Sequence, residues 1–216
     1  ELTQFLNVLF GNISLKPGIR ISDLALPPRF ATLFKGPRFG IDGIRNMLNA
    51  YDRPLISSAI KPMGMPVNEF AELADKFASG GMDIIKDDHG LSNQKFAPYK
   101  ERVRACCNAV NEANVKTGGT TLYFPNITAP FNEITDRAYY AKECGAGGVL
   151  IAPALTGFDA MRFLAEDENF GLPVMSHPAF IGSYLSGASG FTHGALLGKM
   201  MRLAGADIVV YPNFGG

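Results

Sequence analysis

The sequence has no net charge and no long hydrophobic run. Its 20 lysine and arginine residues balance 20 aspartate and glutamate residues, so no charge excess predicts nucleic acid or an anionic membrane surface as a partner. No run of about 18 apolar residues is present, which excludes an ordinary membrane-spanning helix. The first residues, Glu1 to Gln4, lack the basic start of a signal peptide. We therefore expect a cytoplasmic protein with no nucleic-acid partner and no membrane partner.

Cysteine is also scarce. Cys106 and Cys107 are adjacent on one predicted helix, and Cys144, the third cysteine, lies in another. Adjacent cysteines on a helix are poor disulfide partners, and no cysteine spacing typical of a metal site occurs. We expect ordinary buried thiols in a reducing compartment.

The chain does contain enough apolar residues for a core. An apolar content of 47% and a charged content of 19% are typical of a folded globular protein, and 216 residues predict one or two domains. Between short β-rich runs, apolar residues return at helical spacing, as in Phe70, Leu73 and Phe77. This repeat predicts a parallel sheet covered by helices on both faces. The predicted strands are 55–60, 82–86, 121–127, 148–152, 172–176 and 207–210.

Polar residues at the strand ends favour a barrel over an open sheet. The segment after the first strand, Lys61-Pro62-Met63-Gly64-Met65, is not a dinucleotide-binding fingerprint. Polar side chains instead follow several strands, and chemistry drawn from many strand ends is typical of a β/α barrel. These residues are Lys61, Lys86 to His89, Asn126, His177 and Asn213. A closed barrel of this type has eight strands, so we interpret the chain as part of a longer protein.

The first 50 residues have a different pattern. Residues 3–10 are predicted as a strand, Gly11-Asn12 as a turn, and residues 19–24 alternate between apolar and polar. Proline and glycine then punctuate a segment that resembles a linker. We expect residues 1–50 to be the tail of a preceding domain and its connection into the barrel, and residues 51–216 to be a partial (β/α)8 barrel.

The tetrapeptide Lys86-Asp87-Asp88-His89 ends a predicted buried strand. Three charges there are costly to bury unless they pair or bind something. Lys86 and Asp88 lie where a β/α barrel places its catalytic groups, and a structural ion pair is the alternative. Asp87 is expected to make a structural contact, and a metal role is its alternative. His89 is a candidate ligand or a hydrogen-bond donor behind the ligands.

Three further residues allow two interpretations each. Lys61 predicts an acid/base or substrate contact, or else a salt bridge to a carboxylate at a strand end. Asn126 could contact substrate or metal, or could bond only backbone groups. His193 precedes a predicted helix and is expected to be structural or a helix cap.

Taken together, these motifs resemble the large chain of RuBisCO, and within that superfamily the RuBisCO-like proteins of form IV. The resemblance covers essentially the whole chain, and it is the order and spacing of the motifs that are specific. They include Phe10-Gly11-Asn12, Ile21-Ser22-Asp23-Leu24, Ala59-Ile60-Lys61-Pro62, Gly80-Gly81-Met82-Asp83, Lys86-Asp87-Asp88, Leu155-Thr156-Gly157, His177, His193 and Arg202 to Asp207.

The resemblance implies an N-terminal α+β domain, whose end would be residues 1–50, and a (β/α)8 barrel of the TIM type. It also implies a homodimer whose active sites are completed across the interface. It implies that Lys86 is carbamylated and, with Asp88, binds Mg²⁺, and that the metal polarises a ketose phosphate so that a proton can leave. It also implies that Lys61 is an acid/base group and that His177 and Asn12 contact the substrate.

One departure from the family concerns the metal. The third ligand in the family is a glutamate, and here that position is His89. Magnesium prefers oxygen donors, whereas imidazole suits zinc, manganese or iron. Either the metal differs, or its coordination is weaker, or Lys86 is not carbamylated.

Other departures concern carboxylation. Carboxylating members have a second lysine at the position of Met63, which cannot transfer a proton. Pro178 and Val210 replace an arginine and a histidine that grip one phosphate of a bisphosphate. The implied substrate lacks a phosphate at that end and has room for an apolar tail.

We therefore expect a RuBisCO-like enzyme that enolises a phosphorylated ketose or keto sugar acid, as a tautomerase, isomerase or decarboxylase, and does not fix CO₂. The alternatives are a metal-independent isomerase that uses Lys61 and Lys86 as amines, a non-catalytic relative, and a Schiff-base aldolase.

Overall fold

The computed structural model describes residues 1–211, so Asn213 lies outside the described residues. The chain forms two compact units, one made of Glu1–Arg38 with Ala152–Gly216 and the other of Phe39–Ile151.

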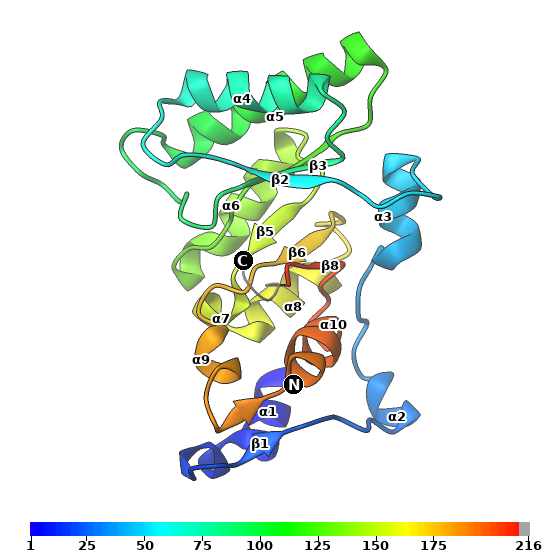
Figure 1. Cartoon of the computed structure of the whole chain (residues 1–216), viewed down its shortest axis with the longest axis vertical. Coiled ribbons are helices and arrows are strands. Elements are labelled where there is room, and N and C mark those ends of the chain that lie inside the picture. Colours follow the sequence, from blue (N-terminus) through cyan, green and yellow to red (C-terminus); the bar gives the residue numbers. More distant parts are fainter. Residues whose placement is uncertain (212–216) are drawn as a thin grey trace. The chain divides into compact units, whose positions relative to one another are not determined.

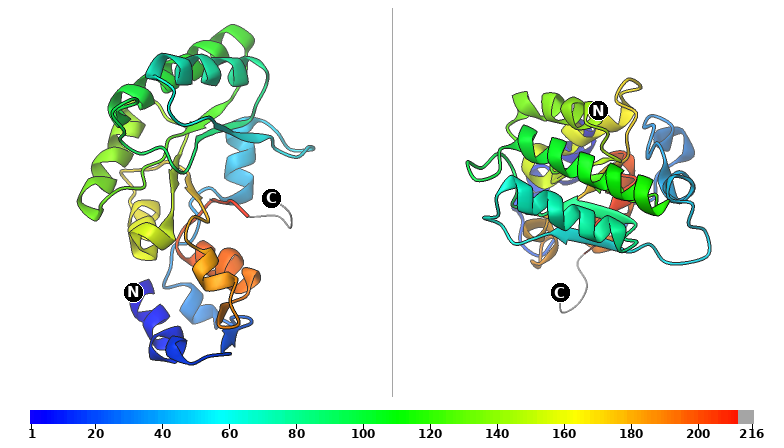
Figure 2. Two further views of the ribbon diagram at one scale, coloured as in Figure 1. Left: turned by 60° about the vertical axis from the view of Figure 1, so that its left-hand side comes forward. Right: turned by 90° about the horizontal axis from the view of Figure 1, so that it is seen from above.

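The unit Phe39–Ile151 alternates strand and helix. Its three-stranded sheet is parallel and has the order β2-β3-β4, so strands that are consecutive in the sequence are neighbours. Helices α4 and α5 contact each other and cover one face of this sheet (Figure 1 and Figure 2). The elements are α3 (Gly40–Leu48), β2 (Ser57–Ile60), α4 (Val67–Ser79), β3 (Ile84–Asp87), α5 (Tyr99–Thr117), β4 (Leu122–Phe124), α6 (Phe131–Glu143) and β5 (Val149–Ile151).

Helix α4 illustrates why these segments fold as they do. Phe70, Ala74 and Ala78 recur every four residues and form its buried side. The helix gives way to Gly80 and Gly81, and Gly81 has a φ of +82°, a left-handed conformation that glycine adopts without steric cost. The chain can then turn directly into β3.

The other unit contains two pairs of parallel strands, β1 with β7 and β6 with β8. Helix α1 packs against α8. The elements are α1 (Leu2–Phe10), η1 (Asn12–Leu15), β1 (Arg20–Ile21), α2 (Pro28–Ala31), α7 (Pro153–Thr156), α8 (Phe158–Glu166), β6 (Val174–Ser176), α9 (Gly182–Leu185), β7 (Gly190–Phe191), η2 (Gly194–Met200), α10 (Met201–Leu203) and β8 (Ile208–Val209).

All six predicted strands are present as β2, β3, β4, β5, β6 and β8, and the predicted helices lie between them. The prediction of a strand at residues 3–10 is wrong, because this segment is helix α1. Its apolar residues Leu2, Phe5, Leu6 and Leu9 follow helical spacing, and Leu2 is completely buried. A short run of apolar residues does not by itself distinguish a strand from a helix, and packing against α8 favours the helix.

Helix α5 is the longest helix described and carries two of the cysteines. Cys106 and Cys107 are buried free thiols, as predicted, and Cys144 is half-buried directly after α6. Burial raises the pKa of Cys106 to about 12, which keeps this thiol neutral. Neither α5 nor any other helix within residues 1–211 is long and apolar enough to cross a membrane.

Candidate active site

Polar residues from three strands gather at one edge of the β2-β3-β4 sheet. Ile60 at the end of β2 lies beside Asp87 of β3, and β3 is in turn paired in parallel with β4. The carboxyl ends of parallel neighbours share one edge of the sheet. The structure therefore brings together the predicted site residues Lys61, Lys86 and Asn126, each at or just after the end of its strand.

Asp88 and Lys61 are in direct contact at this edge. Lys61 Nζ lies 3.3 Å from Asp88 Oδ2, and the lysine side chain is 63% exposed whereas that of Asp88 is only 10% exposed. The Gly90 N–H donates to Asp88 Oδ1 at 2.9 Å, and His89 Nδ1 lies 3.5 Å from the same oxygen. Burial alone would raise the pKa of Asp88, but the bonds from Gly90 and Lys61 outweigh it, so this pKa is lowered. The Asp88 side chain is therefore a carboxylate.

Lys86 is half-buried at the end of β3, and its Nζ donates to the Asp87 carbonyl oxygen at 3.4 Å. The pKa of Lys86 is lowered, chiefly because burial penalises its charged form and further because Lys61 is nearby, although the Asp88 carboxylate opposes the shift. This edge of the sheet thus carries the exposed amine of Lys61 and the half-buried amine of Lys86 near the Asp88 carboxylate.

Asp87 belongs to the interior. Its side chain is completely buried and accepts three hydrogen bonds: from the Tyr123 hydroxyl at 2.6 Å, from the Asn126 N–H at 2.9 Å and from Arg102 Nη2 at 3.2 Å. These donors occupy the carboxylate on both oxygens. The predicted structural contact of Asp87 is confirmed.

Asn126 is bonded to the loop that follows β3. Its Nδ2 donates to the carbonyl oxygens of His89 at 2.9 Å and Leu91 at 2.7 Å, and its Oδ1 accepts a bond from the Thr128 N–H at 3.1 Å. The expectation of backbone bonding is confirmed. Its contact with a substrate stays a prediction.

Three predicted residues lie in the other unit. His177 follows β6 and accepts a hydrogen bond at Nδ1 from the Ala179 N–H at 3.1 Å. Asn12 is exposed at the start of the 3₁₀ turn η1. His193 immediately precedes η2, and its ring centroid lies 5.3 Å from that of Tyr211. The roles of His177 and Asn12 in substrate binding stay predictions.

The donor set at the strand edge decides whether a divalent metal fits. Unmodified, it offers the Asp88 carboxylate, the His89 imidazole and an amine, and residues 1–211 contain no group of three His, Cys, Asp or Glu side chains placed to hold a metal ion. Magnesium prefers oxygen ligands, so these unmodified side chains do not make a Mg²⁺ site. A carbamate on Lys86 would add a second anionic oxygen donor, and with it the set fits a divalent metal.

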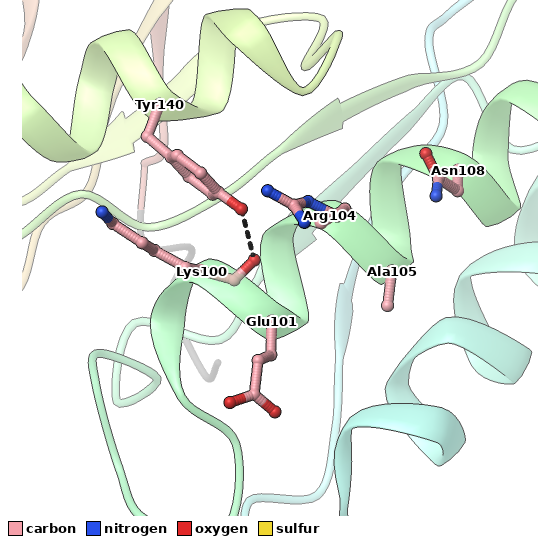
Figure 3. A pocket seen from close by; sticks show the side chains of 6 residues that line it. All are labelled: Lys100, Glu101, Arg104, Ala105, Asn108 and Tyr140. Carbon is pink, nitrogen blue, oxygen red and sulfur yellow. Dashed lines mark hydrogen bonds between the residues drawn. The ribbon is translucent and has the colours of Figure 1, made fainter.

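A separate cavity of about 430 Å³ lies between α5 and α6 and is shown in Figure 3. The Tyr140 hydroxyl donates to the Lys100 carbonyl oxygen there, at 3.0 Å. Lys100 Nζ and the Arg104 guanidinium lie 5.2 Å and 5.8 Å from the Tyr140 ring centroid. None of the predicted site residues lines this cavity, which is bordered by Lys100, Glu101, Arg104, Ala105, Asn108 and Tyr140.

Sequence reasoning missed Arg102, which is completely buried beside Asp87. A signal was present, because Arg102 precedes Cys106 by four residues and so falls on the side of α5 that the apolar residues define. An arginine on a buried helix side indicates a buried partner of opposite charge, and the tetrapeptide at the end of β3 supplies it.

Comparison with known proteins identifies the family. Residues 40–214 match the family model described as ribulose bisphosphate carboxylase large chain, catalytic domain. The chain is 38% identical, over 99% of its length, to the 5-methylthioribulose-1-phosphate isomerase of Rhodospirillum rubrum, of which it covers 56%. It is equally 38% identical, over 99% of its length, to the 2,3-diketo-5-methylthiopentyl-1-phosphate enolase of Bacillus pumilus, of which it covers 53%.

Solved structures agree with the sequence match. A RuBisCO-like protein from Rhodopseudomonas palustris matches the fold with a TM-score of 0.92 at 42% identity, over 100% of this chain and 60% of that one. The solved RuBisCO and RuBisCO-like proteins contain a TIM barrel, which supports the predicted α/β class. The chain spans about half the length of the curated relatives it matches. The chain belongs to the RuBisCO large-chain family, within its RuBisCO-like (form IV) group.

Proposed function

We propose that this chain is part of an enzyme that enolises a phosphorylated ketose or keto sugar acid. The observation that carries the proposal is the 3.3 Å contact between Lys61 Nζ and Asp88 Oδ2, at a sheet edge that also holds Lys86. Removal of a proton beside a carbonyl needs an acid/base group and positive charge near the developing oxyanion. Lys61 supplies the acid/base group, and a metal held by Asp88 and a carbamate on Lys86 would supply the positive charge at the neighbouring strand end.

Lys61 is the acid/base group in this proposal. Its exposed amine can reach a substrate at the strand edge, and its Nζ lies 3.3 Å from Asp88 Oδ2. Asp88 is itself fixed by the Gly90 N–H, so the position of the amine is defined before substrate binds.

With Lys86 carbamylated, Lys86 and Asp88 would hold a divalent metal through oxygen, and His89 would add a nitrogen. A bound metal supplies a Lewis acid for the substrate carbonyl. Mg²⁺ is the family's metal, and the imidazole of His89 also makes Mn²⁺ or Zn²⁺ suitable.

The substrate is proposed to carry one phosphate and an apolar tail. Pro178 and Val210 offer no side-chain donor for a second phosphate. Met63 brings a thioether close to the Asp88-His89-Gly90 turn, because a Cβ added at Gly90 would lie 2.5 Å from Met63 Sδ. Two relatives are named for methylthio sugar phosphates, which are substrates of this class. CO₂ fixation on a bisphosphate is not part of the proposal.

The remaining features are proposed from the family. Residues 1–50 would be the end of an N-terminal α+β domain, and residues 51–216 part of a (β/α)8 barrel. The enzyme would be a cytoplasmic homodimer, with His177, Asn126 and Asn12 as substrate contacts.

Solvent exchange tests the proposal. Full-length protein is incubated in D₂O with Mg²⁺, bicarbonate and 5-methylthioribulose 1-phosphate or 2,3-diketo-5-methylthiopentyl 1-phosphate, the compounds named for relatives. Loss of the proton signal beside the carbonyl, followed by NMR, is the expected result. Equal exchange after metal removal would favour the metal-independent isomerase. No exchange with either compound would favour a non-catalytic protein.

A further inference from the structure

Strand β3 is held by an arginine–aspartate pair at each end. Before the strand, Asp83 accepts two hydrogen bonds of 2.6 Å from Arg53. At its carboxyl end, Asp87 accepts one of 3.2 Å from Arg102. The Arg53 side chain is 51% exposed, whereas those of Arg102 and Asp87 are both 0% exposed. Burial makes such a pair costly unless further hydrogen bonds accompany it, and the additional partners of Arg102 indicate its role.

Arg102 reaches from α5 to the loop after β3, residues 88–98. Its Nη1 donates to the Ala97 carbonyl oxygen at 2.8 Å, and its Nη2 donates to the Ser92 carbonyl oxygen at 2.9 Å as well as to Asp87. One guanidinium therefore joins the end of the strand to two points of the loop. This loop begins with Asp88, the carboxylate in contact with Lys61.

A second anchor shares the Asp87 carboxylate. The Asn126 N–H donates to Asp87 Oδ2, the same oxygen that Arg102 binds, while the Asn126 side chain holds the carbonyl oxygens of His89 and Leu91. The first part of the loop is thus held by Asn126, just after β4, and the later part by Arg102 of α5, and the two anchors meet at Asp87.

We propose that Arg102 is a positioning residue, which acts through Asp87 and the backbone of residues 88–98 to fix the Asp88 carboxylate at the strand edge. This inference rests on the proposed function and adds to it a residue in the helix layer, outside the cluster that meets the substrate. Arg102 touches no reacting group.

This positioning role depends on the planar shape of the Arg102 guanidinium. It donates in fixed directions to Asp87, Ser92 and Ala97 at once, and a lysine ammonium on a flexible stem does not reproduce that planar fork. Removing Arg102 alone would also leave Asp87 buried without its counter-charge, which destabilises a fold strongly. A useful test must separate loss of the loop anchor from loss of the fold.

The double variant Asp87→Asn/Arg102→Met makes that separation. It removes both buried charges together, which is often neutral for stability, but it leaves the Ser92 and Ala97 carbonyl oxygens without their donor. Arg102→Lys keeps the charge and loses the fork. Arg53→Lys is the matched control, since it weakens the pair at the other end of the same strand.

Two measurements on the full-length protein decide the proposal. Hydrogen–deuterium exchange with mass spectrometry follows peptides that cover residues 88–98, without substrate. Solvent-deuterium exchange into the sugar phosphate gives kcat and KM. We expect the double variant to melt near the wild-type temperature, to exchange amides of residues 88–98 about tenfold faster, and to lose about tenfold to a hundredfold in kcat with KM little changed.

Two outcomes would overturn the proposal: wild-type exchange rates for residues 88–98 in the double variant, or equal effects on this segment and on kcat in Arg53→Lys. Because amide exchange is measured without substrate, it decides the positioning role independently. Failure of the wild type to exchange any sugar phosphate would count against the proposed function alone.

Discussion

At the scale of single residues, neighbouring charges at the end of β3 have different partners because successive side chains of an extended chain point to opposite sides. Asp87 is completely buried and bonds Arg102 and Tyr123, whereas the next residue, Asp88, contacts the exposed Lys61. Of these two neighbouring aspartates, Asp87 thus holds the interior together and Asp88 belongs to the proposed site. Substitutions at Asp87 and Lys61 should therefore separate effects on stability from effects on activity.

Lys61→Met should abolish most activity and change stability little. Loss of a general acid/base group typically costs about a hundredfold to ten-thousandfold in rate. The Lys61 side chain is largely solvated and Asp88 keeps its hydrogen bond from the Gly90 N–H, so the loss of this pair contributes little to folding. The measurements are solvent-deuterium exchange and the melting temperature of the full-length protein. Lys76→Met on α4 is the matched control, because the Lys76 side chain is similarly exposed and its Nζ lies 4.0 Å from Glu72 Oε2. Wild-type exchange by Lys61→Met would remove Lys61 from the mechanism.

The proximity of Lys61, Lys86 and Asn126 could be predicted from sequence, because consecutive parallel strands end at the same edge. The partners of each side chain could not. The sequence leaves Asn126 open to substrate or backbone bonding, and its bonds to His89 and Leu91 depend on how the loop after β3 folds. Arg102 is 15 positions from Asp87, and this pairing depends on how α5 packs on the sheet.

At the scale of helices and strands, the repeated β/α pattern could be predicted because each strand and helix has its own hydrophobic period. Two features escaped this reasoning. Residues 3–10 form α1, where packing selects the helical period. Strand β7 is only two residues long and pairs with β1, across most of the sequence, through Arg20 and Gly190. A strand of two residues is too short to show the alternation of apolar and polar residues by which strands are predicted from sequence.

Gly190→Ala should destabilise the β1–β7 pair. Gly190 has a φ of +123°, and an added Cβ would collide with the Tyr184 carbonyl oxygen. We expect a loss of about 2 kcal/mol or more in the free energy of unfolding, measured by urea denaturation. Gly198→Ala in η2 is the control, because its Cβ would meet nothing within 4 Å. Equal stability of the two variants would contradict this account of Gly190.

The Asp83–Arg53 pair should make stability depend on pH. The pKa of Asp83 is lowered mainly by the hydrogen bonds from Arg53, against the effect of burial, and further by the Ile56 N–H. The folded state thus binds this proton less readily than the unfolded chain does. The stabilisation is present above the ordinary aspartate pKa of about 4 and is lost as pH falls through the folded value.

Asp83→Asn should therefore lower the melting temperature at pH 7 and flatten its decline between about pH 5 and pH 3. Differential scanning fluorimetry of the full-length protein across this range measures both effects. Asp52→Asn, at an exposed position, should keep the wild-type profile. A decline as steep in Asp83→Asn as in the wild type would assign the acid sensitivity to other carboxylates.

At the scale of the whole molecule, the fold and the family could be predicted from ordered motifs, but the reaction could not. Relatives with the same 38% identity are named as an isomerase and as an enolase. Such reactions share an enolate-type intermediate and differ in how the substrate is held around it. Identity at this level therefore does not distinguish the two reactions, because the groups around the shared intermediate decide the product.

The proposed homodimer allows a last test, because its sites would be completed across the interface. Asn12 lies within the predicted N-terminal domain and Lys86 within the barrel, so a site would combine Lys86 of one subunit with Asn12 of the other. Asn12→Ala and Lys86→Ala should each be nearly inactive. When the two full-length variants are unfolded together, mixed and refolded, half of the dimers should be mixed, and each should contain one intact site.

Solvent-deuterium exchange should then recover to about a quarter of the wild-type rate, and Lys86→Ala refolded alone is the control. If Asn12 instead served its own subunit, every site in the mixed dimer would carry one defect, and no activity would return. Recovery therefore distinguishes a shared site from two independent ones, because only a shared site lets two inactive chains form a complete set of groups.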